Sequence, residues 1–385
     1  MERLAIEPRA GWQNQAEALG FGFHEMYGEP YWLDDRYYRF TMREIEDEVE
    51  APTEELHALC MALVEEAAAS EELLARLAIP AEQFDTVRRS WHDGQRHLYG
   101  RFDLAYDGTG PAKLLEYNAD TPTAVFETGH FQYNWLTDQI ALGRLPEEAD
   151  QFNLLQESLV EAFALYPADR LFHFAAATAS DEDRGTAAYL MDCAVQAGHR
   201  TRLIDIQGIG VDAQGRFTDP NDQVIDRCFK LYPWEDMMRE PFARFLPDSG
   251  TQWVEPAWKA ILSNKGMLPL LWERHPGHPN LLPAFFEDDP RAAALPDRVR
   301  KPFHSREGEN VSIVEANEPR EASEGDYGAG PAVVQALTPL FRSGEQFAVL
   351  GSWVVGDRAC GLGMREDRSR ITRNLSRFVP HAIRD

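Results

Sequence analysis

Residues 97–119 constrain the fold of this chain most, because they read as two strands joined by a tight turn. The segments HLYGRFDLAYD and AKLLEYNA are rich in strand-forming residues, and the DGTGP connection between them is typical of a hairpin. Arg101 and Asp103 are two residues apart, as are Glu116 and Asn118. Since alternate residues of a strand share one face, pairing of the strands would bring Asp103, Glu116 and Asn118 together.

This set of oxygen donors allows two interpretations. Three hard oxygen ligands suit magnesium, which prefers carboxylate, carbonyl and water oxygens together with a substrate phosphate. Alternatively, Arg101 neutralises the two carboxylates in a salt-bridge cluster at a strand edge, because acids this close repel each other without a cation. The hairpin by itself leaves both interpretations open.

The rest of the chain indicates a mixed α/β protein. Residues 41–95 have helical periodicity, and the apolar residues of TEELHALCMALVEEAAA fall on one stripe. The segments LFHFAAAT, RGTAAYLMDCAVQAG and TRLIDI predict a βαβ unit without a Gly-x-Gly-x-x-Gly fingerprint. Beyond Pro290 the predicted strands are VRKPFH, NVSIVEA, EQFAVLGSWVVG and ACGLGMRE. The acidic, glycine-containing stretch 315–331 is predicted to be a mobile surface loop.

Composition excludes several classes of function. The net charge of −26 argues against nucleic-acid binding, which needs Lys and Arg to neutralise phosphates. The N-terminus lacks the apolar core of a secretory signal, and no apolar run approaches the roughly 20 residues of a membrane span. We therefore expect a soluble cytoplasmic protein that does not contact a membrane. The four scattered cysteines predict reduced core thiols rather than a zinc or disulfide framework.

Two further motifs contain isolated lysines. In KPFHSREGENVSIV, Lys301 faces a connection that contains Gly308, and this arrangement could cover phosphates or could be an ordinary exposed hairpin. In LSNKGMLPLLWE, Ser263 and Asn264 are predicted to cap a helix with Lys265 in its first turn. A cation there opposes the helix dipole, so an anion nearby and a solvated lysine are equally good explanations.

The C-terminal segment GMREDRSRITRNLSRFVPH concentrates guanidinium groups in an otherwise acidic chain. Arginine forms bidentate contacts with phosphate and carboxylate, but here it could equally compensate neighbouring acids such as Glu366 and Asp367. The arginines concerned are Arg365, Arg368, Arg370, Arg373 and Arg377.

Four segments together resemble the glutathionylspermidine synthetase family, specifically its synthetase portion. In chain order they are RFDLAYDGTGPAKLLEYNADTPTAVFET, ILSNKGMLPLLWE, KPFHSREGENVSIV and GSWVVGDRACGLGMRED. The resemblance implies an α/β (α+β) chain with an ATP-grasp fold, preceded by a Rossmann-like βαβ substructure and a helical N-terminal region. Within this single unit, 1–385, the implied regions are a helical one over residues 1–95, a hairpin and Rossmann-like one over 96–255, and a nucleotide-binding one over 256–385.

The resemblance also implies the chemistry. Family members use ATP to convert an acid to an acyl phosphate, which an amine then attacks. Asp103, Glu116 and Asn118 are similar to the magnesium ligands, Arg101 to the transition-state arginine, and Arg365 to an arginine that binds the acid and the intermediate. The implied nucleotide contacts are Arg101, Phe102, Asp103, Lys265, Lys301, Gly308 in the phosphate loop, Gln335 and Arg370.

We therefore expect a magnesium- and ATP-dependent acid–amine ligase acting on small molecules, with a peptide or amino-acid carboxylate as acid and a polyamine or diamine as amine. The acids of SDEDRGT, Asp181, Glu182 and Asp183, could hold an ammonium group or simply cap a helix. No amidase domain is expected ahead of the hairpin, and glutathione, spermidine and the oligomeric state are not assigned. A kinase-like phosphoryl transfer and a non-ligating nucleotide-binding regulator remain as alternatives.

Overall fold

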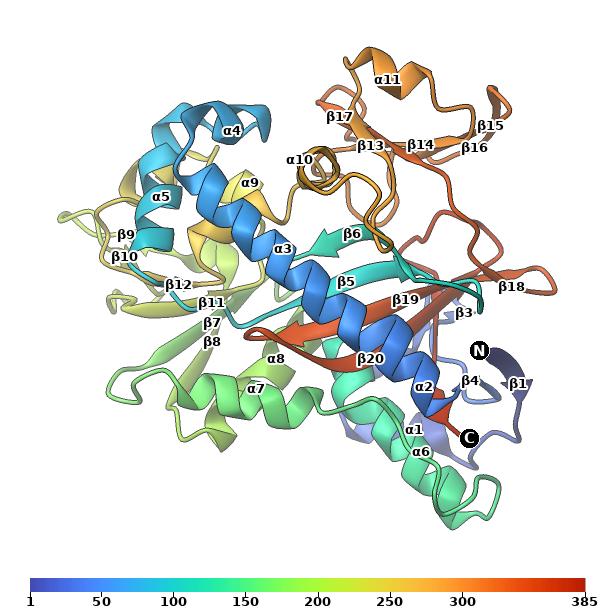
Figure 1. The fold of residues 1–385 in the computed structure, drawn as a ribbon. Helices are drawn as coiled ribbons and strands as arrows, with labels where there is room; N and C mark the ends of the chain where they lie inside the picture. The colour runs from blue at the N-terminus through green and yellow to red at the C-terminus, as the bar shows by residue number, and fades with distance from the viewer. Residues whose placement is uncertain (385) are drawn as a thin grey trace.

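The predicted hairpin forms one side of the largest sheet in the computed structural model, which describes residues 1–384 (Figure 1). Strands β5 (Tyr99–Ala105) and β6 (Lys113–Asn118) are antiparallel, and Asp103 lies opposite Glu116 while Arg101 lies opposite Asn118. The predicted convergence of these side chains is confirmed. The other strands of this six-stranded sheet are β18 (Phe341–Ser343), β19 (Gln346–Val355), β20 (Arg358–Asp367) and β21 (Arg377–Val379).

A second, five-stranded antiparallel sheet lies above the first in Figure 1. In spatial order its strands are β13 (Ala284–Phe286), β17 (Ala332–Ala336), β14 (Arg298–Pro302), β15 (Ser312–Glu315) and β16 (Glu318–Ala322). Helices α10 (Met267–Arg274) and α11 (Pro290–Ala293) pack against it.

Strand β16 corrects the expectation that the whole stretch 315–331 is a loop. The chain turns at Ala316 and Asn317, both with positive φ, and β16 then pairs with β15. Most side chains of β16 are exposed, so its sequence lacks the apolar alternation by which a strand is recognised. The remainder of the stretch is a loop.

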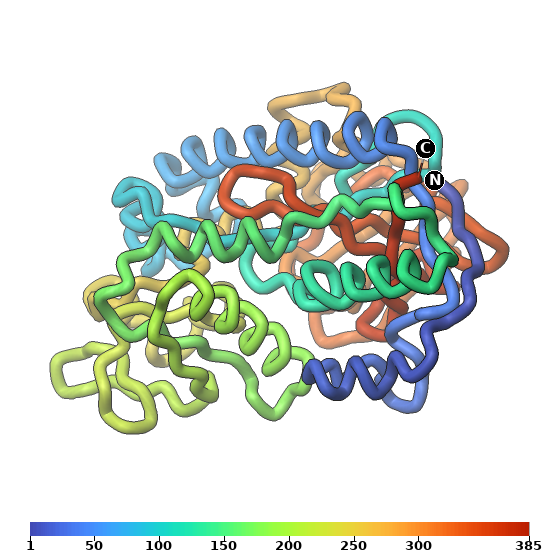
Figure 2. The backbone as a smooth tube through the Cα atoms, turned by 90° about the horizontal axis from the view of Figure 1, so that it is seen from below, coloured from blue at the N-terminus to red at the C-terminus, as the bar shows by residue number. Residues whose placement is uncertain are grey.

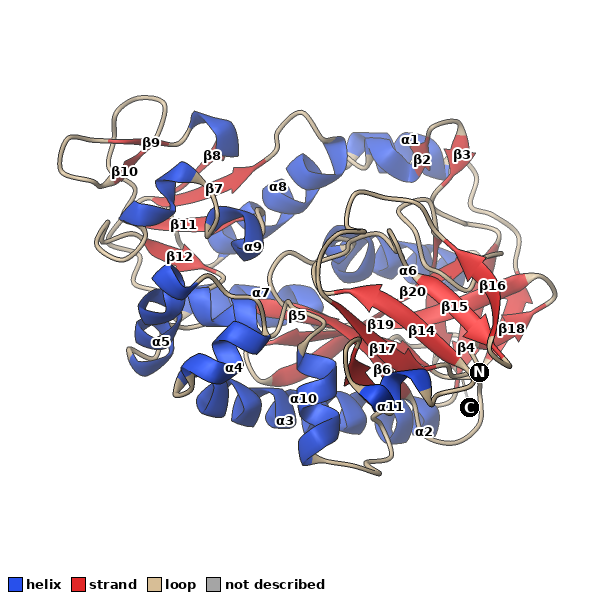
Figure 3. Ribbon diagram, turned by 90° about the horizontal axis from the view of Figure 1, so that it is seen from above, coloured by secondary structure: helices blue, strands red, loops and turns tan. Residues whose placement is uncertain are grey.

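The predicted βαβ unit is confirmed in a four-stranded parallel sheet at the opposite end of the molecule from the five-stranded sheet (Figure 3). Strand β7 (Phe172–Ala176) is buried along its whole length, as expected where both faces of a parallel sheet are covered. The other elements of this region are α8 (Asp181–Gln196), β8 (Thr201–Asp205), β11 (Arg227–Lys230), β12 (Gln252–Val254), the ribbon β9 (Gly210–Val211) and β10 (Phe217–Thr218), and α9 (Trp234–Met237).

The N-terminal helices cover the six-stranded sheet, and α3 (Ala51–Ala68) crosses its β19 and β20 strands (Figure 1). Of the predicted stripe of α3, Leu56, Cys60 and Leu63 are at most 2% exposed, and Leu59 is half-buried. The neighbouring helices are α2 (Met42–Ile45), a π-helical turn (Glu46–Glu50), α4 (Glu71–Arg76) and α5 (Phe84–His92). Helices α6 (Gln132–Ala141), after a π-helical turn (Glu127–Phe131), and α7 (Leu155–Ala164) follow the hairpin.

The run of covering helices begins at Met42 rather than at the N-terminus. Before it, β1 (Glu2–Ala5) and β4 (Arg36–Phe40) form a sheet with the C-terminal strand β22 (His381–Ile383), so the two termini lie side by side (Figure 2). This pairing joins the two ends of the chain, and local periodicity therefore does not reveal it. Helix α1 (Trp12–Ala18) and the short strands β2 (Glu25–Met26) and β3 (Glu29–Pro30) complete this region.

The four cysteines are buried and free, as predicted. Within residues 1–384, no helix has the length and apolar character that crossing a membrane requires.

Candidate active site

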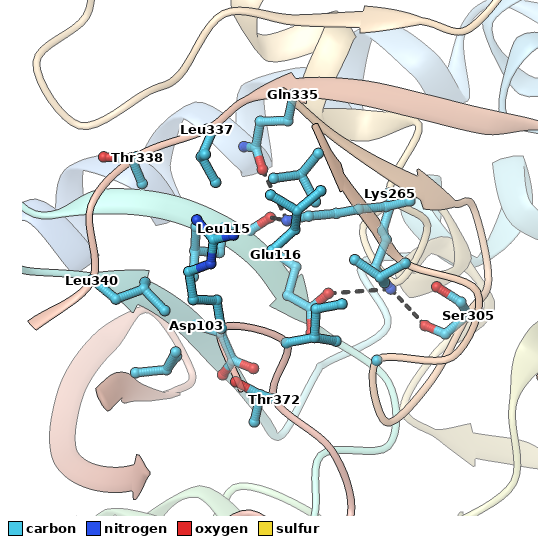
Figure 4. Close-up of a pocket in the computed structure, with 18 of the residues that line it drawn as sticks. Asp103, Leu115, Glu116, Lys265, Ser305, Gln335, Leu337, Thr338, Leu340 and Thr372 are labelled. Atoms are coloured by element: carbon cyan, nitrogen blue, oxygen red, sulfur yellow. Dashed lines mark hydrogen bonds and ion pairs between the residues drawn. The ribbon is translucent and has the colours of Figure 1, made fainter. Parts of the chain in front are cut away.

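A cavity lies between the six-stranded and five-stranded sheets, and most of the predicted nucleotide-binding residues line it (Figure 4). These residues are Asp103, Lys265, Lys301, Gly308, Gln335 and Arg370, and the predicted metal ligand Glu116 lies among them. Apolar side chains from both sheets and from the connection after β17 complete the lining. They include Leu115, Val299, Val311, Ile313, Leu337, Leu340 and Val349. The cavity therefore combines a polar end on the hairpin with an apolar wall.

The two acids of the hairpin are held by different cations. The Arg101 guanidinium donates to both Asp103 carboxylate oxygens, from Nε at 2.7 Å and from Nη2 at 3.2 Å, while its Nη1 donates to the Thr123 carbonyl. Asn118 Nδ2 donates to Asp103 Oδ2 at 3.1 Å. Burial raises the pKa of Asp103 and the Glu116 charge adds to this, whereas Arg101 opposes it. The Arg101–Asp103 ion pair and the side-chain oxygens of Asp103, Glu116 and Asn118 therefore lie on the same face of the hairpin.

Lysines surround Glu116. Lys265 Nζ lies 3.2 Å from Glu116 Oε2 and donates to the Ser305 carbonyl at 2.6 Å. Burial alone would raise the pKa of Glu116, but the charges of Lys265 and Lys301 outweigh burial and lower it to about 2. Lys301 Nζ donates to Gln335 Oε1 at 2.9 Å, and burial lowers the pKa of Lys301 to about 8. Glu116 is therefore ionised at neutral pH.

The helix after Lys265 begins later than predicted. Gly266 precedes α10 as its N-cap residue, and neither Ser263 nor Asn264 caps the helix through its side chain. Asn264 Oδ1 instead accepts a hydrogen bond from the Gly266 N–H at 2.8 Å, a local turn that competes with helix formation. Lys265 consequently lies just before the N-cap residue rather than in the first turn of the helix.

Gly308 occupies a position that other residues fit poorly. Its φ is +70°, and an added Cβ would lie 2.3 Å from the Thr372 carbonyl oxygen and 2.6 Å from Ile371 Cγ2. The loop between β14 and β15 therefore packs closely on residues 371–372, which also line the cavity. No sequence pattern signalled Thr372, because this contact joins segments that are remote in the chain.

Gln335 and Arg370 lie in the cavity with protein partners. Gln335 Nε2 donates to the Leu114 carbonyl at 2.9 Å, which fixes the orientation of the amide. Arg370 forms ion pairs with Glu315 at 2.8 Å and Glu321 at 3.5 Å. Arg370 thus compensates acids of the neighbouring hairpin β15–β16 rather than Glu366 or Asp367, which follow Arg365 in sequence.

Phe102 does not present its side chain to the cavity. Strand alternation turns it to the other face from Asp103, where it is fully buried and stacked on Tyr117 with ring centroids 3.8 Å apart. The expected nucleotide contact of Phe102 is therefore restricted to its backbone.

Arg365 lies outside the lining of this cavity, next to a buried acid. Its guanidinium donates to the carbonyls of Ser376 at 2.8 Å and Arg373 at 2.9 Å and lies 5.4 Å from the centre of the Tyr31 ring. The Tyr31 hydroxyl donates to Glu127 Oε1 at 2.7 Å, and burial raises the pKa of Glu127 to about 7. Sequence reasoning missed Glu127, although a carboxyl group in the apolar run TAVFET was a signal.

A second, polar cavity adjoins the first and shares Glu116, Lys265 and Ser305 with it. Arg306 crosses this second cavity, donating to Thr121 Oγ1 at 2.7 Å and to Glu235 Oε1 at 2.8 Å. The other polar residues of its lining include Asn118, Asp120, Asn264 and His304. Of the predicted metal ligands, Glu116 therefore lines both cavities, Asp103 lines the first and Asn118 lines the second.

The acidic start of α8 is a capped helix terminus. Ser180 Oγ accepts a hydrogen bond from the Asp183 N–H at 3.3 Å, and Arg184 pairs with Asp181. Burial raises the pKa of Asp183 to about 6, and Glu182 adds to this shift. The capping role of this segment is thus observed, and one of its three carboxylates, that of Asp181, already has a cation as its partner.

Comparison with known proteins places the fold. A family model described as glutathionylspermidine synthase preATP-grasp matches residues 3–384. A Haemophilus influenzae protein with the provisional name acid–amine ligase is 38% identical over 381 aligned residues, covering 94% of each chain. Trypanothione synthetase of Crithidia fasciculata is 29% identical over 358 residues, covering 86% of this chain and 54% of that protein.

Among solved structures, a glutathione synthetase-like effector from Globodera pallida covers 90% of this chain and 89% of its own, with a TM-score of 0.57 and 12% identity. At this identity the likeness bears on the fold alone. The predicted α/β class with ATP-grasp architecture is confirmed.

Proposed function

Because the chain belongs to the glutathionylspermidine synthase family and is an ATP-dependent ligase that forms carbon–nitrogen bonds, we propose that it joins a small-molecule acid to an amine through an acyl phosphate. The observation that carries this proposal is the junction of the two cavities, where Glu116 and Lys265 line both. A nucleotide in the first cavity and an acid in the second would meet at these residues.

The hairpin residues fit a magnesium ion. Asp103, Glu116 and Asn118 present two carboxylates and an amide on one face, a donor set that magnesium prefers. Magnesium bound there would neutralise negative charge on the phosphates. Arg101 holds Asp103 through two hydrogen bonds, and Lys265 keeps Glu116 ionised, so the ligand oxygens are already oriented.

The first cavity suits ATP. We assign the phosphates to the end that contains Lys265, Lys301 and the loop of Gly308, because ammonium groups and exposed backbone N–H groups bind phosphate oxygens. The base would lie against the apolar wall, with Gln335 and Arg370 as polar contacts. Phe102 would contribute through its backbone only.

The acid and the amine are assigned by charge. Arg365 would bind the carboxylate and the intermediate, and Arg101 would stabilise the negative charge of the transition state. Asp181, Glu182 and Asp183 would hold an ammonium group of the amine. A peptide or amino-acid carboxylate and a polyamine or diamine fit these charges.

We further propose that the chain works as one catalytic unit of three regions. Residues 1–95 would cover the sheet, 96–255 would supply the hairpin and the substrate side, and 256–385 would supply the nucleotide side. The shared cavity lining is what makes the last two regions interdependent.

The test is a screen of acids and amines with ATP and magnesium, read by mass spectrometry for a condensed product and by ADP release. A ligase releases ADP and accumulates an amide only when both substrates are present. A stable phosphorylated acceptor formed without amine would instead indicate a kinase-like activity. Nucleotide binding without ADP release across the screen would indicate a regulator, and either result would overturn the proposal.

A further inference from the structure

Two histidines and an aspartate from three separate segments meet at the end of the six-stranded sheet that lies away from the hairpin acids. His57 projects from α3, His97 lies in the segment between α5 and β5, and Asp357 lies in the turn between β19 and β20. Strand pairing places Val355 opposite Tyr99 and Gly351 opposite Asp103, so Asp357 lies beyond the strand ends. This cluster is distinct from the proposed ATP site.

The ligand-type atoms of the cluster converge. Asp357 Oδ1 lies 3.0 Å from His57 Nε2 and 3.2 Å from His97 Nε2, and one donor atom from each of the three residues lies within 4.8 Å of the others. Both imidazoles therefore present the same nitrogen to one point. A tetrahedral zinc ion with bonds of about 2.0–2.2 Å places its ligand atoms roughly 3.4 Å apart, so each distance from Asp357 Oδ1 to an imidazole nitrogen needs to lengthen by only a few tenths of an ångström.

The surrounding structure fixes the rings. The His57 and His97 rings stack with centroids 5.5 Å apart and 27° between their planes, and Trp258 packs edge-on against His97 at 5.3 Å. The turn is held as well, because Gly356 has a φ of +56° and its N–H donates to the Leu98 carbonyl at 2.9 Å. A ligand set of this kind requires little reorganisation on binding.

The second nitrogen of each imidazole is not committed to another group. The Nδ1 atoms of both histidines are buried and have no hydrogen-bond partner among residues 1–384. No second hydrogen bond therefore fixes the tautomer of either ring, and a neutral imidazole with its proton on Nδ1 presents its Nε2 lone pair to the centre of the cluster.

We propose that His57, His97 and Asp357 form a binding site for a divalent transition metal of the zinc type. Two imidazoles and one carboxylate suit zinc, cobalt or nickel rather than magnesium, which prefers oxygen ligands. His97 and Asp357 line an open cleft, so the fourth position of the metal would face solvent and bind water. The metal would tie α3, the segment before β5 and the β19–β20 turn together behind the catalytic hairpin.

Zinc titration of the purified full-length protein by calorimetry tests this proposal. Excess magnesium in the buffer occupies sites made of oxygen ligands, and cobalt added in a parallel experiment reports imidazole ligation through its visible absorption. We expect one zinc per chain and a rise in melting temperature with zinc. His97→Gln and Asp357→Asn should each weaken zinc binding by at least roughly 100-fold, since changing even an outer-shell partner costs about 10- to 100-fold.

His92→Gln is the matched control, because His92 lines the same cleft but does not belong to the cluster. It should bind zinc as the wild type does. Asp357→Asn keeps an oxygen that accepts from both imidazoles, so this exposed change reports on ligation even if His97→Gln misfolds. Absence of stoichiometric zinc in the wild type, or equal zinc binding in Asp357→Asn, would overturn the proposal and leave a purely hydrogen-bonded cluster.

Discussion

Replacement of Gly308 by alanine tests whether the loop between β14 and β15 binds phosphate. The substitution places a Cβ 2.3 Å from the Thr372 carbonyl oxygen, where ordinary contact begins near 3.4 Å, so the loop or residues 371–372 must shift by about 1 Å. Such a shift withdraws backbone N–H groups from the phosphates. A hydrogen bond to a charged group contributes about 1.5–3 kcal/mol. Each bond lost would therefore weaken ATP binding roughly 10- to 150-fold.

Gly143→Ala separates this effect from backbone strain. Gly143 has a φ of +67°, close to the +70° of Gly308, but an added Cβ there meets no atom of residues 1–384 within 4 Å. Both variants bear the left-handed backbone cost of about 1–2 kcal/mol, visible as a lower melting temperature. Calorimetric titration with ATP and magnesium should show weakened binding in Gly308→Ala alone. Unchanged affinity in Gly308→Ala, or equal weakening in Gly143→Ala, would refute the reasoning.

Three further substitutions test the remaining roles. Glu116→Gln should abolish magnesium-dependent ADP release with little change in melting temperature, because the side chain keeps its volume. If the variant turns over like the wild type at every magnesium concentration, Glu116 is not a metal ligand. ATP affinity should fall as pH rises through about 8, because Lys301 is charged below that pKa and neutral above it. Lys301→Arg should bind ATP without this pH dependence, and a persistent slope would assign the titration elsewhere. Arg365→Lys should slow single-turnover ligation roughly 30- to 1000-fold while ATP affinity stays unchanged. Near-normal ligation in a variant with an unchanged melting curve would show that Arg365 does not act on the substrate.

The hairpin and the convergence of its polar side chains could be predicted because they depend on local rules. A period of two places Arg101 and Asp103 on one face of the first strand, and Glu116 and Asn118 on one face of the second. The exact register, with its irregularity between Asp103 and Leu104, did not follow from the sequence. The same rule, applied to Phe102, places its side chain on the opposite face, where it packs on Tyr117. The alternation of a strand thus locates the face that holds Asp103 and Glu116, and it also shows that the side chain of Phe102 is turned away from that face.

What sequence reasoning missed depends on contacts between remote segments. Strand β16 has few buried side chains, and its pairing with β15 is visible only in three dimensions. The close packing of Gly308 on Thr372 and the ion pair of Arg370 with Glu315 each join segments more than 50 residues apart. No local pattern encodes the partner in such a contact, although a glycine or an arginine can mark one side of it.

The positions of the lysines in this chain say more about the site than the positive charge of the lysines does. Of the 38 basic residues only five are lysines, so arginine supplies nearly all of the positive charge, and each lysine lies in the β5–β6 hairpin or contacts the hairpin or the residues just after it. Lys113 is part of β6, and Lys259 Nζ donates to the Tyr99 and Ala119 carbonyls, one on each side of the hairpin. Lys230 binds Asp120 just after β6.

Lys265 and Lys301 bind the same hairpin from the nucleotide side, through Glu116 and the Leu115 carbonyl. A compact ammonium group donates three hydrogen bonds at one point, whereas a planar guanidinium needs a wider, flat partner. Lys265 and Lys301 therefore bring compact positive charges close to Glu116, and these charges offset the repulsion between the hairpin acids that would bind the metal. In a chain this rich in arginine, four of the five lysines thus place a buried or half-buried ammonium group against an acid or a carbonyl of the hairpin or of the residues just after it, and the exception is Lys113, whose hydrogen bond is exposed.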